Sequence, residues 1–105
     1  MPSSPADPDI VDVPAESRFV AEKDGSLAEL VYRLEDGRLV VVHTGVPEDL
    51  EGHGLGARLV RSALDKAVRE GRTLVPLCPF ARRWLREHPD DANRLAVDWH
   101  MEEGR

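Results

Sequence analysis

The chain has very little cysteine and no long apolar segment. Cys78 is the one cysteine among 105 residues, so no disulfide forms within the chain, and this composition suits a reducing cytoplasm. The longest uninterrupted apolar run, residues 39–42, is far shorter than a membrane-spanning helix. The first nine residues lack the basic start and apolar middle of a signal peptide. We therefore expect a cytoplasmic protein that does not enter a membrane.

Basic residues are outnumbered as well. The chain carries 14 Lys and Arg against 20 Asp and Glu, a net charge of -6. Nucleic acids and anionic membrane surfaces attract basic proteins, so this balance argues against both as partners and favours a cationic partner such as an amine. One cysteine and four scattered histidines offer no close ligand spacing, and we expect no metal site. The sequence leaves the oligomeric state open.

The length bounds the number of domains. A chain of 105 residues suffices for one modest hydrophobic core and is too short for two. Residues 1–15 contain four of the eight prolines and read as a flexible N-terminal arm. We expect one folded domain over residues 16–100 and a C-terminal tail over residues 101–105.

Two Asp-Gly pairs, at 24–25 and 36–37, divide the first half of the domain. Such pairs favour tight hairpin turns. The flanking segments 18–22, 27–35 and 38–44 are rich in apolar and β-branched residues, in part alternating with polar ones. The pattern predicts an antiparallel meander of three strands.

The second half begins with an amphipathic helix over residues 55–68, which Gly71 is well placed to terminate. One face of this helix is apolar and carries Leu55, Leu59, Val60, Ala63, Leu64, Ala67 and Val68. A fourth strand follows at 73–78, and Pro76 within it predicts an edge, a bulge or a point where strands separate. The strand–helix–strand crossover makes strands 38–44 and 73–78 parallel.

Two further helices are expected, over 80–88, before Pro89, and over 91–99. The predicted class is thus α/β (α+β): a mixed sheet of three antiparallel strands, a helix, a parallel strand and C-terminal helices.

The segment Gly52-His53-Gly54-Leu55-Gly56-Ala57 opens the long helix without a break. Alternate glycines let the backbone approach a ligand closely and take conformations that side chains forbid. The helix start adds unpaired N–H groups and the positive end of the helix dipole. This combination favours an anion, usually a phosphate or pyrophosphate, and predicts a phosphorylated cofactor.

The same segment formally satisfies the dinucleotide fingerprint G-x-G-x-x-G/A, but its context argues against that fold. Residues 45–51, including Pro47, separate the turn from the preceding strand, and no acidic residue ends the next strand. The chain before the glycine turn is predicted to form hairpins, whereas the dinucleotide-binding fold is built from repeated βαβ halves. A P-loop is excluded because no Gly-Lys-Ser/Thr follows.

Several segments together resemble a known family. The run Glu51-Gly52-His53-Gly54-Leu55-Gly56 follows the acetyl-CoA signature Gln/Arg-x-x-Gly-x-Gly/Ala of the GCN5-related N-acetyltransferases. The runs His43-Thr44-Gly45-Val46-Pro47 and Val75-Pro76-Leu77-Cys78-Pro79-Phe80, with His88-Pro89, are similar to its very short single-domain subgroup. The resemblance covers about residues 17–90, and the conjunction is more specific than any single motif.

This resemblance implies acetyl-CoA as cofactor and a site where its parts bind. The pyrophosphate is expected on the backbone N–H groups of residues 53–57, and the pantetheine arm between strands 38–44 and 73–78. The arginines at 82, 83 and 86 offer a place for the 3′-phosphate, and the alternative is a solvated helix face. The expected cofactor-binding set is Thr44, Val46, Gly52, His53, Gly54, Leu55, Gly56, Ala57, Phe80 and Arg83.

Glu51 departs from the family pattern, which has Gln or Arg at this position. A carboxylate beside a pyrophosphate is unfavourable if it points inward. We expect its side chain to turn to solvent and the affinity for CoA to be reduced.

Two residues are candidates for the chemistry. Cys78 precedes a helix N-terminus and has arginines one turn further on, an environment that favours a nucleophilic thiolate able to carry an acetyl group. The alternative is a small buried apolar residue that lines the site. His43, at the end of a buried strand, is a candidate general base, and the alternative is a histidine satisfied by a neighbour. Tyr32 is a further possible proton donor, if its strand face lines the cleft.

The resemblance implies transfer of acetyl from acetyl-CoA to an amine, either directly or through acetyl-Cys78. The acceptor is a small amine, a polyamine, or a lysine or N-terminus of another protein. One alternative is a CoA-binding regulatory module with little turnover, and another is an interaction domain without a ligand.

Overall fold

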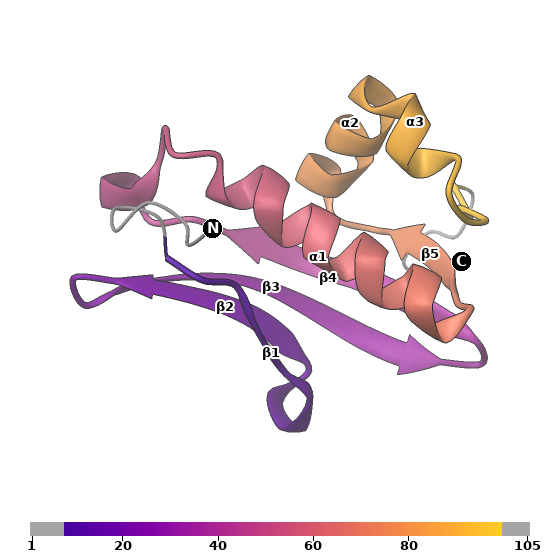
Figure 1. Ribbon diagram of the computed structural model, residues 1–105, viewed down its shortest axis with the longest axis horizontal. Coiled ribbons are helices and arrows are strands. Elements are labelled where there is room, and N and C mark those ends of the chain that lie inside the picture. The colour runs from indigo at the N-terminus through magenta and orange to yellow at the C-terminus, as the bar shows by residue number, and fades with distance from the viewer. Residues whose placement is uncertain (1–7, 100–105) are drawn as a thin grey trace.

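Five strands form one mixed sheet in the order β1-β2-β3-β4-β5 (Figure 1). The structure is a computed structural model that describes residues 8–99. Its elements are β1 (Val11–Val13), η1 (Pro14–Glu16), β2 (Arg18–Lys23), β3 (Ser26–Glu35), β4 (Arg38–Gly45), η2 (Glu48–Leu50), α1 (Leu55–Glu70), β5 (Thr73–Pro76), α2 (Pro79–Glu87) and α3 (Pro89–Ala92). No helix in this part of the chain is long and apolar enough to span a membrane.

The predicted meander of β2, β3 and β4 is confirmed. Adjacent strands are antiparallel, and the Asp-Gly pairs at 24–25 and 36–37 form both turns. Asp24, Gly25, Asp36 and Gly37 all have positive φ, between 49° and 83°. A two-residue turn of this kind matches the right-handed twist of the strands it joins, which is why this dipeptide favours hairpins.

A β-bulge interrupts the pairing of β3 with β4. Tyr32 pairs with Val41 and Val31 pairs with His43, so Val42 is an extra residue in β4. Side chains alternate between the two faces of a strand, and one extra residue exchanges the faces for every position that follows. The bulge therefore places Thr44, which pairs with the buried Leu30, on the face that packs against α1.

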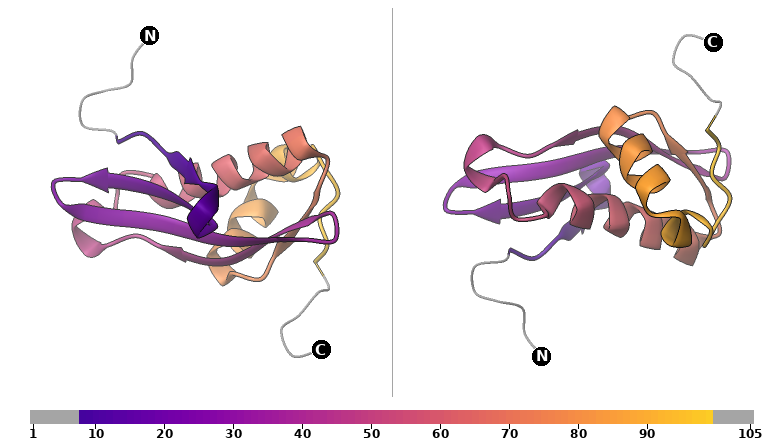
Figure 2. Two further views of the ribbon diagram at one scale, coloured as in Figure 1. Left: turned by 90° about the horizontal axis from the view of Figure 1, so that it is seen from below. Right: turned by 90° about the horizontal axis from the view of Figure 1, so that it is seen from above.

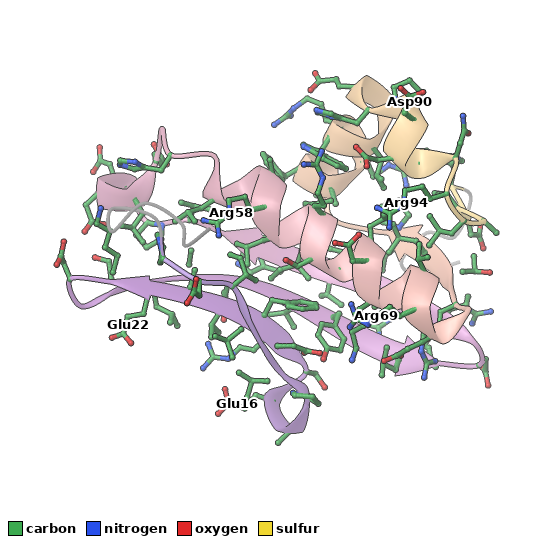
Figure 3. All side chains as sticks on the ribbon, viewed as in Figure 1. Glu16, Glu22, Arg58, Arg69, Asp90 and Arg94 are labelled. Atoms are coloured by element: carbon green, nitrogen blue, oxygen red, sulfur yellow. The ribbon has the colours of Figure 1, made fainter. Side chains whose placement is uncertain are left out.

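The amphipathic helix α1 packs across the sheet and connects β4 to β5, which are parallel as predicted. Figure 2 shows α1 running along the sheet, and in Figure 3 Glu22 projects from β2 on the side away from α1. Gly71 ends α1 with φ at 68°, and its N–H bonds to carbonyls of the last turn. Two positions depart from a simple amphipathic pattern: Val68, expected on the apolar face, is exposed, whereas the charged Lys66 is buried.

Lys66 is buried because it joins a polar network with β1 and β3. Its Nζ lies 2.9 Å from Oδ2 of Asp12 and 3.1 Å from a carboxylate oxygen of Glu70. The Tyr32 hydroxyl donates to Oδ1 of Asp12 at 2.6 Å. A buried charge requires such partners, and the network attaches β1 to the helix and the centre of the sheet.

The expectation of a flexible arm is wrong for residues 11–15, since Val11–Val13 pairs with β2 as the edge strand β1 and η1 follows. Two interactions that link it to distant parts of the chain, the ladder with β2 and the Asp12 network, hold this segment. Residues 1–7 of the arm, the end of the expected domain at residue 100 and the tail 101–105 lie outside the described residues.

The predicted helix over 91–99 is also wrong, because α3 ends at Ala92. Val97 instead forms a parallel bridge with Leu74 of β5. The Leu74 N–H donates to Ala96 O at 2.9 Å and the Asp98 N–H donates to Leu74 O at 2.8 Å. These bonds satisfy the outer edge of β5, a tertiary requirement that overrides local helix propensity.

We predict that Tyr32 titrates late and that stability falls at alkaline pH. Burial, reinforced by the hydrogen bond to Asp12, raises the pKa of Tyr32 to about 12, above the ordinary value of about 10. The stabilisation is therefore complete below about pH 10 and is lost as the pH rises towards about 12. The hydrogen bond to Asp12 also raises the pKa of Lys66. Loss of the Lys66 proton at alkaline pH therefore lowers the stability as well.

Tyr32 is the chain's single tyrosine, so phenolate absorbance reports it directly. Urea unfolding across the same pH range measures the stability, and the urea-unfolded chain gives the reference titration. A phenolate midpoint near pH 10 in the folded protein contradicts the network.

Candidate functional site

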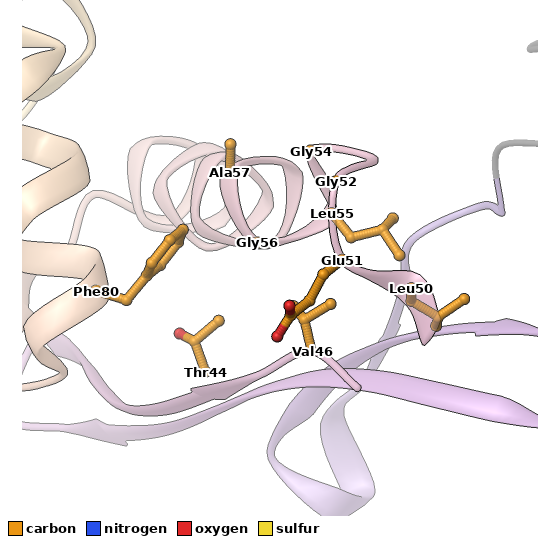
Figure 4. Close-up of a pocket in the computed structure, with 10 residues that line it drawn as sticks. All are labelled: Thr44, Val46, Leu50, Glu51, Gly52, Gly54, Leu55, Gly56, Ala57 and Phe80. Atoms are coloured by element: carbon orange, nitrogen blue, oxygen red, sulfur yellow. The ribbon is translucent and has the colours of Figure 1, made fainter. Parts of the chain in front are cut away.

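A pocket of about 500 Å³ lies between the first turn of α1, the end of β4 and α2 (Figure 4). It brings together eight of the ten residues that sequence analysis assigned to cofactor binding. The lining residues are Thr44, Val46, Leu50, Glu51, Gly52, Gly54, Leu55, Gly56, Ala57 and Phe80.

The pocket opens where β4 and β5 separate. Their ladder ends at the pair Val41 and Pro76, and Val41 O accepts hydrogen bonds from the N–H groups of Leu77 and Cys78 at 3.0 and 3.1 Å. Two N–H groups bond to one carbonyl because the chain turns away from β4 at this point. Beyond this point β4 runs on to Gly45, so its last residues have no β5 partner among residues 8–99.

The glycine turn presents backbone N–H groups to the pocket. Gly52 and Gly54 have φ at 86° and 72°, in the left-handed region that glycine adopts without strain. Gly54 caps α1, no side chain bonds to the helix start, and Arg58 N–H to Gly54 O at 3.1 Å is the first helical bond. The N–H groups of residues 55–57 therefore lack intrahelical acceptors and lie at the positive end of the dipole. Such a helix start suits an anion.

Phe80 closes the pocket opposite the turn by contacting the backbone of α1. A Cβ atom at Gly56 would lie 2.8 Å from Cζ of Phe80, closer than two carbon atoms can approach without one of them moving. Only glycine at position 56 lets the ring lie this close to the helix. The contact fixes one wall of the pocket.

Two members of the expected cofactor set do not line the pocket. His53 is exposed at the outside of the turn. Arg83 is also exposed, and its guanidinium lies over the Phe80 ring, 5.7 Å from the centroid. Arg83 is therefore linked to the pocket through Phe80.

Cys78 lies directly behind the pocket wall. The residue is 4% exposed and forms the N-cap of α2, with Pro79 as the first helical residue. Its thiol donates to Oγ1 of Thr44 at 3.5 Å, and Thr44 lines the pocket. The sulfur is thus one side chain away from the pocket space.

The structure does not bring His43 to the same place. Successive strand residues point to opposite faces, so His43 lies on the face opposite Thr44, where it is exposed and packs near Gly45. The bulge at Val42 causes this placement. Tyr32 is also outside the pocket lining, and its hydroxyl is occupied by Asp12.

Glu51 corrects one expectation and Leu50 adds a residue that sequence reasoning missed. We expected the Glu51 side chain to turn to solvent, but although the residue is exposed, its carboxylate points toward Val46 and Thr44 (Figure 4). Leu50 is a buried residue of η2 that forms part of the apolar wall. Its one sequence signal is an apolar residue between acidic neighbours just before the glycine turn.

Comparisons with known proteins agree with this geometry. The family model described as GCN5-related N-acetyl-transferase matches residues 18–95. A solved NMR structure of a GCN5-like protein from Staphylococcus aureus is 23% identical, with a TM-score of 0.69, and the match covers 95% of this chain and 99% of that chain. At this identity the likeness shows the fold alone. No curated protein matches the sequence significantly.

We predict energetic coupling between Gly56 and Phe80. In a helix, alanine is favoured over glycine by about 1 kcal/mol, but Gly56→Ala forces the Phe80 ring to move and loses this gain. In a Phe80→Leu background the ring is absent, and Gly56→Ala becomes stabilising. Urea unfolding of the four proteins measures a coupling of about 1 kcal/mol or more. Additive effects would disprove the contact.

Proposed function

Because the chain belongs to the GCN5-related N-acetyltransferase family, we propose that it binds acetyl-CoA in this pocket and transfers the acetyl group to an amine. One observation carries the proposal. A helix start suited to an anion and the unpaired end of β4 border the same pocket. A ligand with a diphosphate at one end and an amide-containing arm at the other needs both features.

The residues present fit this ligand. The N–H groups of residues 55–57 would hold the diphosphate, and the open edge of β4 near Thr44 and Val46 offers backbone groups to the amides of the pantetheine arm. Val46, Leu50 and Phe80 supply apolar walls. Because Gly56 has no side chain, the Phe80 ring lies directly against the helix and forms one wall of the pocket.

The proposed reaction conserves atoms as follows. The lone pair of the amine nitrogen attacks the thioester carbonyl carbon, and the carbon–sulfur bond breaks. The sulfur leaves with the bond's electron pair and takes up a proton, and the nitrogen loses one. Direct transfer needs no covalent bond to the protein. In the alternative route the Cys78 thiolate attacks first, CoA leaves as the thiol, and the amine then attacks acetyl-Cys78.

The hydrogen bond between Cys78 and Thr44 supports the covalent route. The Thr44 hydroxyl is the one polar contact of the thiol among residues 8–99, and the covalent route requires this side chain to move so that the thioester can reach the sulfur. In the direct route Cys78 packs behind the pocket wall and contacts no reacting atom.

A second function is a CoA-binding module with little turnover. One observation favours it: His43 lies on the opposite face of the sheet, which leaves no imidazole in the lining. Turnover with any amine separates the two functions.

We predict that acetyl-CoA adds one acetyl group to the wild-type protein and none to Cys78→Ala, measured by intact mass. CoA should raise the Tm of both proteins alike, because the diphosphate is proposed to bind the backbone N–H groups of residues 55–57 and not the sulfur of Cys78. Thr44→Val is the matched variant, because it removes the hydroxyl that accepts the hydrogen bond of the Cys78 thiol and keeps the shape of the side chain. Stabilisation without an adduct, with transfer to an added amine, would establish the direct route. Neither stabilisation nor adduct would disprove acetyl-CoA binding.

We predict that Glu51→Gln strengthens CoA binding. Two unit charges 4 Å apart in water repel by about 1 kcal/mol, so removal of the carboxylate lowers the Kd by about fivefold. Titration calorimetry at low and high salt measures the change, which should shrink as salt screens the charge. Glu48→Gln, in the neighbouring exposed position that does not line the pocket, is the control. Equal affinities for the two variants would show that the Glu51 carboxylate does not face the diphosphate.

A further inference from the structure

The exposed side of α2 carries an unusual concentration of positive charge. Arg82, Arg83 and Arg86, with Pro79 and Glu87, line a shallow groove of about 440 Å³, here called the arginine groove. The whole chain has a net charge of -6, so this groove is a local reversal of its sign.

The three guanidinium groups have no carboxylate partners within the described residues 8–99. Other arginines of the chain, such as Arg18 and Arg94, lie 2.8 Å from a carboxylate oxygen. In the groove, Arg82 donates to the carbonyl of Pro76 at 3.1 Å, and no ion pair joins Glu87 to any of the three. Among the described residues no carboxylate therefore offsets their charge.

Aromatic rings hold these guanidinium groups in place. Arg82 and Arg86 lie over the ring of Trp99, 5.9 and 5.3 Å from its centroid, and Arg83 lies over Phe80 at 5.7 Å. Such contacts use the face of a guanidinium and leave its N–H edges free for carboxylates or phosphates. Because the groups are already ordered, less side-chain entropy is lost when an anion binds.

The arrangement suits an extended anion better than a single phosphate. Two different rings hold the arginines, Trp99 on one side and Phe80 on the other, so the groups spread along α2. A peptide with several carboxylates can engage them in succession. Phe80 also lines the neighbouring pocket and contacts Arg83 of the groove, so the groove and the pocket adjoin at this ring.

We propose that the arginine groove binds the acidic side chains of a polypeptide whose amine is acetylated in the neighbouring pocket. The inference rests on the proposed function and specifies its acceptor class: a lysine or N-terminal amine flanked by Asp or Glu. The groove supplies affinity for the flanking residues, and the pocket supplies the reaction.

The test compares two peptides that share one amine, flanked by Asp and Glu in the first and by Asn and Gln in the second. For the wild type, kcat/KM for the acidic peptide should exceed that for the neutral peptide by about tenfold, as expected for charge-assisted hydrogen bonds. Arg83→Gln/Arg86→Gln should remove this preference, so that the ratio of the two kcat/KM values falls to about one. Arg69→Gln is the control, because Arg69 is exposed in the last turn of α1 (Figure 3), outside the groove lining.

Two binding measurements make every outcome informative. Fluorescence anisotropy of the labelled peptides reports binding without turnover, so specific acidic-peptide binding with no acetylation supports the groove and rejects the acetyltransferase function. Equal binding of both peptides, or no effect of the double variant, overturns the groove. A further measurement compares the binding of CoA with that of dephospho-CoA, which lacks the 3′-phosphate. If the double variant weakens CoA alone, the groove serves the cofactor's 3′-phosphate and the acidic-acceptor proposal is rejected.

Discussion

The separation of β4 from β5 is the constraint on which the rest of the structure depends. The parallel ladder ends at the pair Val41 and Pro76, and Val41 O accepts the N–H groups of both Leu77 and Cys78 as the chain turns away. This turn starts α2 and carries Cys78 to its N-cap. The end of β4 is left open beside the first turn of α1. A continuous ladder would fill the space that the pocket occupies.

Stability and binding meet in α1. Its apolar face contacts β2, β3, β4 and β5 and supplies much of the buried core, whereas its first turn supplies the N–H groups of the pocket. The same helix approaches Phe80 at Gly56 and carries Lys66 into the network with Asp12. Because α1 packs in the core and its first turn borders the pocket, a change in the packing of the helix also moves the pocket.

Charge is distributed against the average of the chain. An acidic protein places Glu51 toward a pocket suited to an anion, and it concentrates on α2 three arginines that have no carboxylate partner among residues 8–99. The carboxylate weakens the attraction that the helix start provides, and the arginines create attraction next to it. In water these effects are each of the order of 1 kcal/mol, which is enough to decide between ligands of similar shape.

The sequence determined the elements whose causes are local. The Asp-Gly turns, the amphipathic helix and the glycine turn follow from backbone preferences and periodicity, and they placed most of the pocket lining correctly. Tertiary structure decided the rest. The bulge at Val42 turned His43 away and Thr44 inward, Val97 paired with the edge of β5, and Asp12 tied β1 to the core. These outcomes depend on strand register and on buried polar partners far apart in the chain, and local residue patterns carry no record of either.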